Sequence, residues 1–203
     1  MNAPKTNLIT KTGDATVSFL CFLKELTIFC GECVHSTIQG IKRPKSIRWK
    51  DTLYYMDMCG REAVPIVMLI CFLMGLILGF QAAVQLHQFG TDIYVADLVG
   101  LSIVKELGPL MVGIICTGRA GSAFAAEIGT MKVNEEVDAL YTMGHEPFRF
   151  LAFPKVIAMI TVLPILVIFG DIAGVLGGYV VGVFKLGLPT AAYINQSINA
   201  IHY

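Results

Sequence analysis

An unbroken apolar run, AVPIVMLICFLMGLILGF, occupies residues 63–80. It lies inside a longer uncharged stretch that continues to Thr91. About 20 apolar residues in helical form cross the ~30 Å hydrocarbon core of a bilayer. The run starts far from the N-terminus and lacks a small-residue cleavage site at its end, so it is not a signal peptide. We therefore interpret residues 62–86 as a transmembrane helix.

Two more hydrophobic stretches follow the first. Residues 95–126 form the second, although they include Lys105, Glu106 and Arg119. Residues 156–184 form the third and contain a single charged residue. The sequence therefore predicts an all-α, polytopic integral membrane protein with three transmembrane helices.

The overall composition agrees with a membrane protein. Hydrophobic residues make up 55% of the 203 positions, and the mean hydropathy is +0.69. One soluble core of this length could not bury so much apolar surface, and a disordered chain would be far more polar. The 15 Lys and Arg balance the 15 Asp and Glu, which argues against nucleic-acid binding. Six cysteines in a chain of this length do not form a disulfide framework.

The distribution of Lys and Arg predicts the orientation in the membrane. The loop at residues 85–95 has none, whereas the loop at residues 127–155 has three. Six lie in the segment just before the first span, namely Lys42, Arg43, Lys45, Arg48, Lys50 and Arg61. Since cytoplasmic loops are enriched in these residues, we expect the N-terminus and the 127–155 loop to be cytoplasmic.

The segment before the first span has an amphipathic pattern. Apolar residues recur at helical spacing between Phe19 and Val34, opposite Lys24 and Glu25. A basic cluster with Trp49 follows. We expect residues 17–60 to form a helix and basic segment in the cytoplasmic interface, and residues 1–16 to be a tail or linker. The alternative is a helix that packs on the rest of the protein.

Small residues recur at intervals of four in each span. Such stripes allow close contact between helices in lipid, where little hydrophobic force drives association. We expect them to mark helix–helix contacts, within the chain or between two copies. They comprise Gly75 and Gly79 in the first span, Gly118, Ser122 and Ala126 in the second, and Gly170, Gly174, Gly178 and Gly182 in the third.

The second span carries charge at depth. Ionisable residues inside a membrane usually face a cavity or a partner, so Lys105 and Glu106 are candidates to line one. Pro109 removes a helical hydrogen bond and favours a kink beside them. The alternative is a mutually neutralised pair that only orients the helix. Arg119, fourteen residues after Lys105, is more simply a packing or interfacial cation.

The 127–155 loop contains a second amphipathic pattern. Val133, Val137, Leu140 and Tyr141 form an apolar helical stripe. Thr130 or Asn134 would cap its start, and the Met143–Gly144 pair would end it. A short helix of this kind could dock a soluble partner. It could instead lie flat on its own protein.

Catalytic motifs are absent from the sequence. It has no phosphate-binding loop of the GxxxxGK[ST] type and no HExxH metal motif. Cys30 and Cys33 have metal-like spacing but no second ligand pair. Asp171 among glycines could serve a proton relay. We therefore expect a non-catalytic chain with no cofactor or metal.

Several segments of the sequence together resemble one family. They are KELGP at 105–109, GRAGSA at 118–123, AEIGTMKV at 126–133, EVDAL at 136–140 and MG at 143–144. These segments are similar to the MlaE family, the permease subunits of ABC transporters that work with MCE-domain lipid-binding proteins. The resemblance extends from about residue 19 to residue 193.

The resemblance implies a homodimer in the bacterial inner membrane that binds two cytoplasmic ATPase subunits and a periplasmic MCE-domain protein. Such an assembly moves phospholipid between the inner membrane and the outer envelope, and ATP is bound by the ATPase rather than by this chain. The family's charged pair near the lipid cavity matches Lys105 and Glu106, and we add Pro109 and Arg119 as lipid-path candidates. The family's coupling helix, which inserts into the ATPase, matches residues 131–144. The coupling candidates are Glu127, Met131, Lys132, Glu136, Val137, Asp138, Leu140, Tyr141 and Gly144.

Members of this family have five spans, whereas this sequence predicts three and ends inside the expected loop helix at 189–201. Residues 61–203 would therefore be an incomplete permease domain, either a fragment or a truncated paralogue. Three other functions stay open. The chain could be an ion-coupled secondary transporter or channel that uses Lys105, Glu106, Arg119 and Asp171, an intramembrane lipid-modifying enzyme, or a non-functional fragment.

Overall fold

The computed structural model describes residues 8–42, 49–144 and 148–202. These residues form helices and connecting turns, with no strand among them. Three helices are long and apolar enough to cross a membrane, Trp49–His87, Asp92–Val133 and Phe150–Phe184. The prediction of an all-α polytopic membrane protein with three spans is confirmed.

The first span is the single helix α2 (Trp49–His87). The third is α7 (Phe153–Phe184), which directly follows the π-helical turn η5 (Phe148–Ala152). The second span consists of several consecutive helical segments. It comprises the 3-10 turn η2 (Asp92–Tyr94), α3 (Val95–Ser102), the π turn η3 (Ile103–Leu107), α4 (Gly108–Cys116), the π turn η4 (Thr117–Gly121) and α5 (Ser122–Val133). Outside the spans lie α1 (Leu8–Lys42), α6 (Glu136–Thr142) and α8 (Thr190–His202).

The helices extend beyond the spans expected from hydropathy. The first begins at Trp49 instead of residue 62, and the second continues to Val133 instead of residue 126. At ~1.5 Å per residue, α2 is about 60 Å long, roughly twice the hydrocarbon thickness. Charged residues end an apolar run without ending a helix, so these helices continue past the membrane core at the α6 end.

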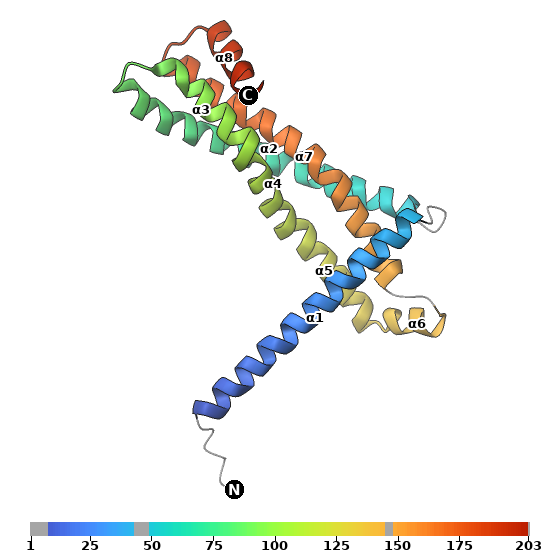
Figure 1. Ribbon diagram of the computed structural model, residues 1–203. Coiled ribbons are helices and arrows are strands. Elements are labelled where there is room, and N and C mark those ends of the chain that lie inside the picture. Colours follow the sequence, from blue (N-terminus) through green and yellow to red (C-terminus); the bar gives the residue numbers. More distant parts are fainter. Residues whose placement is uncertain (1–7, 43–48, 145–147, 203) are drawn as a thin grey trace.

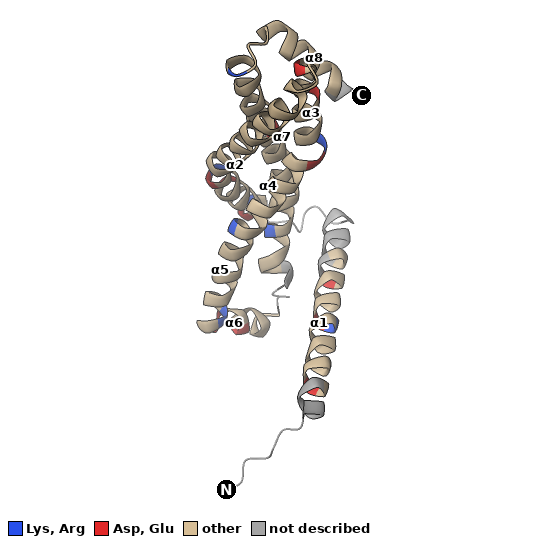
Figure 2. Ribbon diagram, turned by 90° about the vertical axis from the view of Figure 1, so that its left-hand side faces the viewer, with Lys and Arg blue, Asp and Glu red and all other residues tan. Residues whose placement is uncertain are grey.

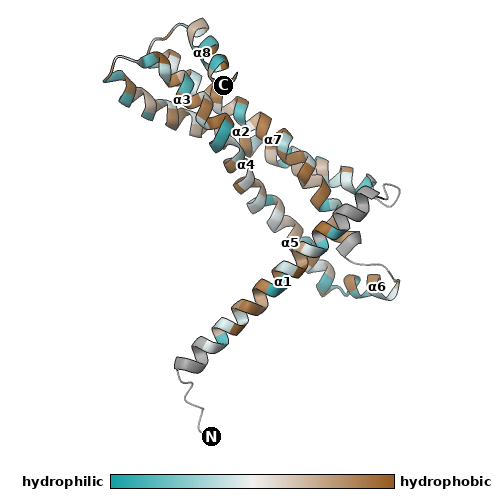
Figure 3. Ribbon diagram, viewed as in Figure 1, coloured by the Kyte–Doolittle hydropathy of each residue, from teal (hydrophilic) through white to brown (hydrophobic). Residues whose placement is uncertain are grey.

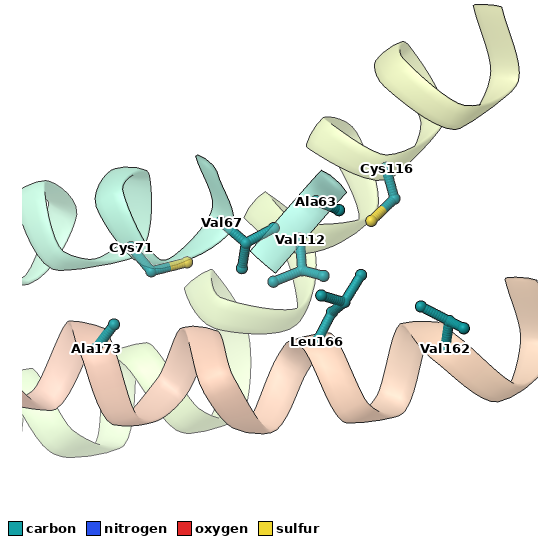
Figure 4. Close-up of a cluster of buried hydrophobic side chains, with 8 residues drawn as sticks. All are labelled: Ala63, Val67, Cys71, Val112, Cys116, Val162, Leu166 and Ala173. Carbon is teal, nitrogen blue, oxygen red and sulfur yellow. The ribbon is translucent and has the colours of Figure 1, made fainter. Parts of the chain in front are cut away.

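The core lies between α2, α4 and α7. Helices α2 and α7 run side by side over most of their length and make the most extensive contact in the structure (Figure 1). Hydrophobic residues predominate in both helices (Figure 3). A cluster of buried residues joins them to α4 (Figure 4), made of Ala63, Val67, Cys71, Val112, Cys116, Val162, Leu166 and Ala173.

Glycines permit the close approach of α2 to α7. A Cβ atom at Gly75 would overlap the carbonyl oxygen of Gly174, and one at Gly177 would overlap the carbonyl oxygen of Phe72. The backbones therefore touch where a larger residue would force them apart. The predicted small-residue contacts of the first and third spans are formed within the chain.

The small-residue stripe of the second span faces no other segment of the described chain. Gly118, Ser122 and Ala126 are exposed, and a Cβ atom at Gly118 would have no neighbour within 4 Å. We predicted that such stripes mark contacts either within the chain or between two copies. For this stripe, a contact between two copies remains a prediction.

Helix α1 is longer than expected. It begins at Leu8, so residues 8–16 of the predicted tail or linker are helical. All its described side chains from Gly13 to His35 are exposed. The helix stands apart from α5 and α6 (Figure 2), and its contacts with the bundle are limited ones with η5 and α7. Its location in a membrane interface stays a prediction, and most of the basic cluster, residues 43–48, lies outside the described residues.

Candidate functional site

A π turn carries the charged pair of the second span. In η3, the N–H of Gly108 donates to the carbonyl of Ile103, five residues back, instead of Val104. Pro109 follows with no N–H, so the turn accommodates the proline predicted to disturb this helix. Such π turns are frequent at functional sites. Lys105 and Glu106 are both exposed, and neither makes an ion pair within the described part of the chain.

Lys105 lines a cavity of about 400 Å³ between the start of the second span and α8. Its walls are Asp97, Leu98, Leu101, Lys105, Gln196, Asn199 and Ala200. Lys105 is the one cation among these residues. Glu106 and Pro109 do not belong to the lining, so only one member of the predicted pair faces this space.

Asp97 and Gln196 connect the two walls of this cavity. The side-chain amide of Gln196 donates to Asp97 Oδ2 at 2.7 Å. Asp97 Oδ1 is buried and has no hydrogen-bond partner among the described residues. Neither residue belongs to the motifs predicted from the sequence. One signal was available, because Asp97, Leu101 and Lys105 recur at intervals of four and so share one helical face.

Tyr193 holds α8 against the third span. Its side chain is 1% exposed, and its ring lies where a Cβ atom of Gly182 would be. Burial raises the pKa of its hydroxyl to about 12. The Tyr179 ring packs edge-on against it at 5.7 Å between centroids. The two glycine positions 178 and 182 thus form a seat for an aromatic side chain, which fixes the outer wall of the cavity.

Asp171 lies beside the π turn. A Cβ atom at Gly108 would overlap its Oδ1, which is buried and has no hydrogen-bond partner among the described residues. Within this part of the chain, no hydrogen bond or ion pair joins any two of the proposed relay groups Lys105, Glu106, Arg119 and Asp171. These four groups are therefore not in direct contact with one another in the described part of the chain.

Arg119 belongs to a different environment. It pairs with Glu62 of α2 at 3.1 Å, and both side chains are about half exposed. The two residues border a space of about 20 Å³, large enough for one water molecule, together with Cys59 and Cys116. The lipid-path candidates are therefore separated, since Arg119 does not line the cavity that contains Lys105.

The predicted coupling helix at 131–144 is divided in two. The long second span ends at Val133, the chain reverses at Asn134, and α6 begins after Glu135, whose φ is +59°. Met131 and Lys132 thus belong to α5. Neither Thr130 nor Asn134 caps α6, while the expected end at Gly144 has a φ of +74°, suited to glycine.

The apolar residues of this region divide into two groups. Leu140 is 6% exposed and packs inside the chain, and Val137 is half-buried. Val133, Tyr141 and Met143 are exposed by 83%, 65% and 64%. Glu136, Asp138 and Lys132 are exposed as well. The exposed large apolar side chains of residues 131–144 are therefore Val133, Tyr141 and Met143, which together we call the α6 patch.

Glu127 belongs to a partly buried cluster with residues of the other two spans. Its carboxylate pairs with Lys155 Nζ at 2.9 Å and accepts a 2.7 Å hydrogen bond from the Tyr55 hydroxyl. The Lys155 ammonium also lies over the rings of Tyr55 and Phe124, at 5.1 and 5.3 Å from their centroids. This foot cluster, Tyr55, Phe124, Glu127 and Lys155, joins all three spans at the α6 end. Sequence reasoning missed it, because Lys155 resembled an ordinary loop cation.

Comparison with known proteins identifies relatives along most of the chain. The family described as "Permease MlaE" matches residues 52–203. A probable ABC transporter permease protein of Rickettsia conorii is 37% identical over 194 residues, which cover 94% of this chain and 72% of the relative. The intermembrane phospholipid transport system permease protein MlaE of Haemophilus influenzae is 33% identical over 148 residues, 73% of this chain and 57% of the relative. The chloroplastic protein trigalactosyldiacylglycerol 1 of Arabidopsis thaliana is 30% identical over 174 residues, which cover 86% of this chain and 45% of the relative.

Proposed function

The chain belongs to the MlaE permease family, and we propose that, as the membrane subunit of an ABC-type transporter, it moves phospholipid. The observation that carries this proposal is the cavity of about 400 Å³ in which a single lysine is surrounded by polar and aliphatic residues. A phospholipid combines an anionic phosphate with apolar chains, and this lining offers a partner for each. Its relative in Haemophilus influenzae is named for intermembrane phospholipid transport.

The two ends of the bundle suit different partners. We propose that the α6 end is cytoplasmic and that the α6 patch docks on an ABC ATPase, which binds and hydrolyses ATP for the assembly. The proposal is supported by three exposed apolar side chains beside acidic residues, which could enter a groove in a soluble partner. This orientation also follows the excess of Lys and Arg at that end. The chain itself would have no catalytic role.

The α8 end would then face the far side of the membrane. We propose that an MCE-domain lipid-binding protein receives or delivers lipid there, and that the membrane is the bacterial inner membrane. A homodimer would cover the exposed stripe of Gly118, Ser122 and Ala126, which the single chain leaves unpaired.

Affinity purification of the tagged chain from its native membranes tests this proposal. We expect an ATPase subunit and an MCE-domain protein to be recovered with it, as identified by mass spectrometry. Recovery of the folded chain alone, at good yield and in a detergent that preserves other ABC assemblies, would contradict the proposal. Ion flux through the purified chain in liposomes without nucleotide would favour the secondary transporter instead.

A further inference from the structure

We propose that the cavity between α3 and α8 binds the phosphoethanolamine headgroup of a phospholipid, with Lys105 contacting the phosphate and Asp97 accepting hydrogen bonds from the primary ammonium group. The inference rests on the proposed function and adds the class of headgroup. It concerns the two ionisable residues of opposite charge that line this cavity.

The order of the two charges along the helix matches the order of groups in such a lipid. Asp97, Leu101 and Lys105 share one face, with Asp97 nearer the α8 end and Lys105 about 12 Å deeper, at ~1.5 Å per residue. In phosphatidylethanolamine the phosphate lies next to the glycerol and acyl chains, and the ammonium group lies farther out. A lipid with its chains toward the bilayer centre would therefore place phosphate near Lys105 and ammonium near Asp97.

The environment of Asp97 favours a donor of N–H groups. One carboxylate oxygen already accepts from Gln196 at 2.7 Å, while the other is buried without a hydrogen-bond partner among the described residues. Because Oδ1 is closed off from the cavity, an ammonium group there would approach Oδ2, which can accept a second hydrogen bond beside that from Gln196, and it would also supply a charge that compensates the carboxylate. Choline has no N–H, a glycerol headgroup has no positive charge, and a serine headgroup would place a second carboxylate beside Asp97.

The remaining walls suit a lipid better than a small soluble ion. Leu98, Leu101 and Ala200 provide apolar surface beside the polar groups. A volume of about 400 Å³ accommodates a headgroup and part of the glycerol, so the acyl chains would extend into the surrounding bilayer. Free glycerophosphoethanolamine has the same headgroup chemistry without the chains and serves to distinguish the two sources.

Photo-crosslinking in nanodiscs tests the inference. The full chain, purified with its natural partners, is placed in nanodiscs with equal amounts of phosphatidylethanolamine, phosphatidylcholine and phosphatidylglycerol. A photo-reactive amino acid replaces Ala200, and mass spectrometry identifies the lipid class that is attached. We expect phosphatidylethanolamine to predominate, and soluble glycerophosphoethanolamine not to compete. Equal labelling of the three classes, or efficient competition by the soluble compound, would overturn the inference.

Two substitutions separate the roles of the charges. Asp97→Asn should lower the ratio of phosphatidylethanolamine to phosphatidylcholine by roughly tenfold, the scale of one charge-assisted hydrogen bond. Lys105→Gln should lower labelling by all three lipids by a similar factor. Asp92→Asn and Lys185→Gln change the same residue types outside the cavity lining and should leave both quantities unchanged. An unchanged ratio in Asp97→Asn would contradict the assignment of the ammonium site.

A further variant guards against loss of folding. Gln196→Leu removes the donor to Asp97 Oδ2 but keeps the charge of Asp97, so the preference for phosphatidylethanolamine should persist, and its loss would count against the inference. Recovery of the ATPase with each variant is measured in the same preparations. Absence of the ATPase would contradict the proposed transporter, whereas an altered lipid ratio concerns the headgroup site alone.

Discussion

At the scale of single residues, Lys155 shows how a cation is accommodated at the end of a membrane bundle. Its side chain is 4% exposed, its ammonium pairs with Glu127 at 2.9 Å, and two aromatic rings cover it. Glu127 is 38% exposed and also accepts from Tyr55. Water can therefore reach the carboxylate of this ion pair but hardly the ammonium, so loss of the partner should cost more free energy for Lys155 than for Glu127.

This difference predicts an unequal effect of the two substitutions. Glu127→Gln leaves a buried ammonium without its anion and should lower the free energy of unfolding by roughly 1–3 kcal/mol. Lys155→Met removes the buried charge and leaves a carboxylate that water and Tyr55 can still reach, so its effect should be smaller. Unfolding in detergent micelles with increasing denaturant measures both. Glu62→Gln, in a half-exposed pair, is the control and should cost under about 1 kcal/mol. Equal losses for Glu127→Gln and Lys155→Met would contradict this description of the cluster.

Glycine positions allow a second prediction at this scale. Gly75→Ala places a Cβ atom against the carbonyl oxygen of Gly174, so α2 and α7 must separate, at about 1–3 kcal/mol. Gly118→Ala meets nothing within 4 Å in the chain and should leave the stability of the single chain unchanged or slightly higher. Thermal unfolding of the two variants in the same detergent provides the comparison. A Gly75→Ala variant as stable as the parent would show that the helices are not in backbone contact.

At the scale of elements, the exposed α6 patch differs from the apolar stripe expected from periodicity. Leu140 belongs to the apolar stripe in the sequence but packs inside the chain, whereas Tyr141 and Met143 are exposed. Tyr141→Asp should therefore abolish recovery of the ATPase while the unfolding midpoint stays unchanged. Leu140→Asp should lower the midpoint as well, because it buries a carboxylate.

Pull-down of the ATPase and thermal unfolding on the same samples separate these outcomes. Tyr141→Phe keeps the apolar ring and serves as the matched control, with recovery close to that of the parent. If Tyr141→Asp binds the ATPase normally, the α6 patch is not the docking surface.

The elements also show how far the sequence could predict this structure. The apolar runs of α2 and α7 are long enough that their existence and type followed directly from hydropathy. The break between α5 and α6 did not, because Glu135 adopts a positive φ that its residue type does not signal. The foot cluster joins Tyr55 to Glu127 and Lys155, which are far apart along the chain, and periodicity within one helix carries no information about such contacts.

The lipid-path candidates illustrate the same limit. Lys105 was identified because a charge at membrane depth is unusual, and the structure places it in a cavity wall. Arg119 satisfied the same criterion but pairs with Glu62 elsewhere. The sequence does not indicate the pairing of Asp97 with Gln196, because it depends on α8 folding back over α3. That contact in turn depends on Tyr193, whose ring packs against Gly178 and Gly182.

At the scale of the whole molecule, the α6 end contains the foot cluster and the α6 patch, while the α8 end contains a polar cavity beside a π turn. A rigid α2–α7 pair connects the two ends (Figure 1). This arrangement suits a permease in which an ATPase acts at one end and lipid is held near the other. The second span, in contrast, is interrupted by two π turns, which are frequent at functional sites.

The most direct measurement of this account is ATP-dependent phospholipid transfer. The full assembly, with the chain in its natural complex, is reconstituted in liposomes containing a labelled phospholipid, and transfer to an acceptor is followed with and without ATP. We expect transfer that requires ATP and falls several-fold in Lys105→Gln, while ATP hydrolysis and recovery of the ATPase are retained. Transfer that is equal in Lys105→Gln and the parent would contradict the lipid path, and no ATP-dependent transfer by the intact parent assembly would contradict the proposed function itself.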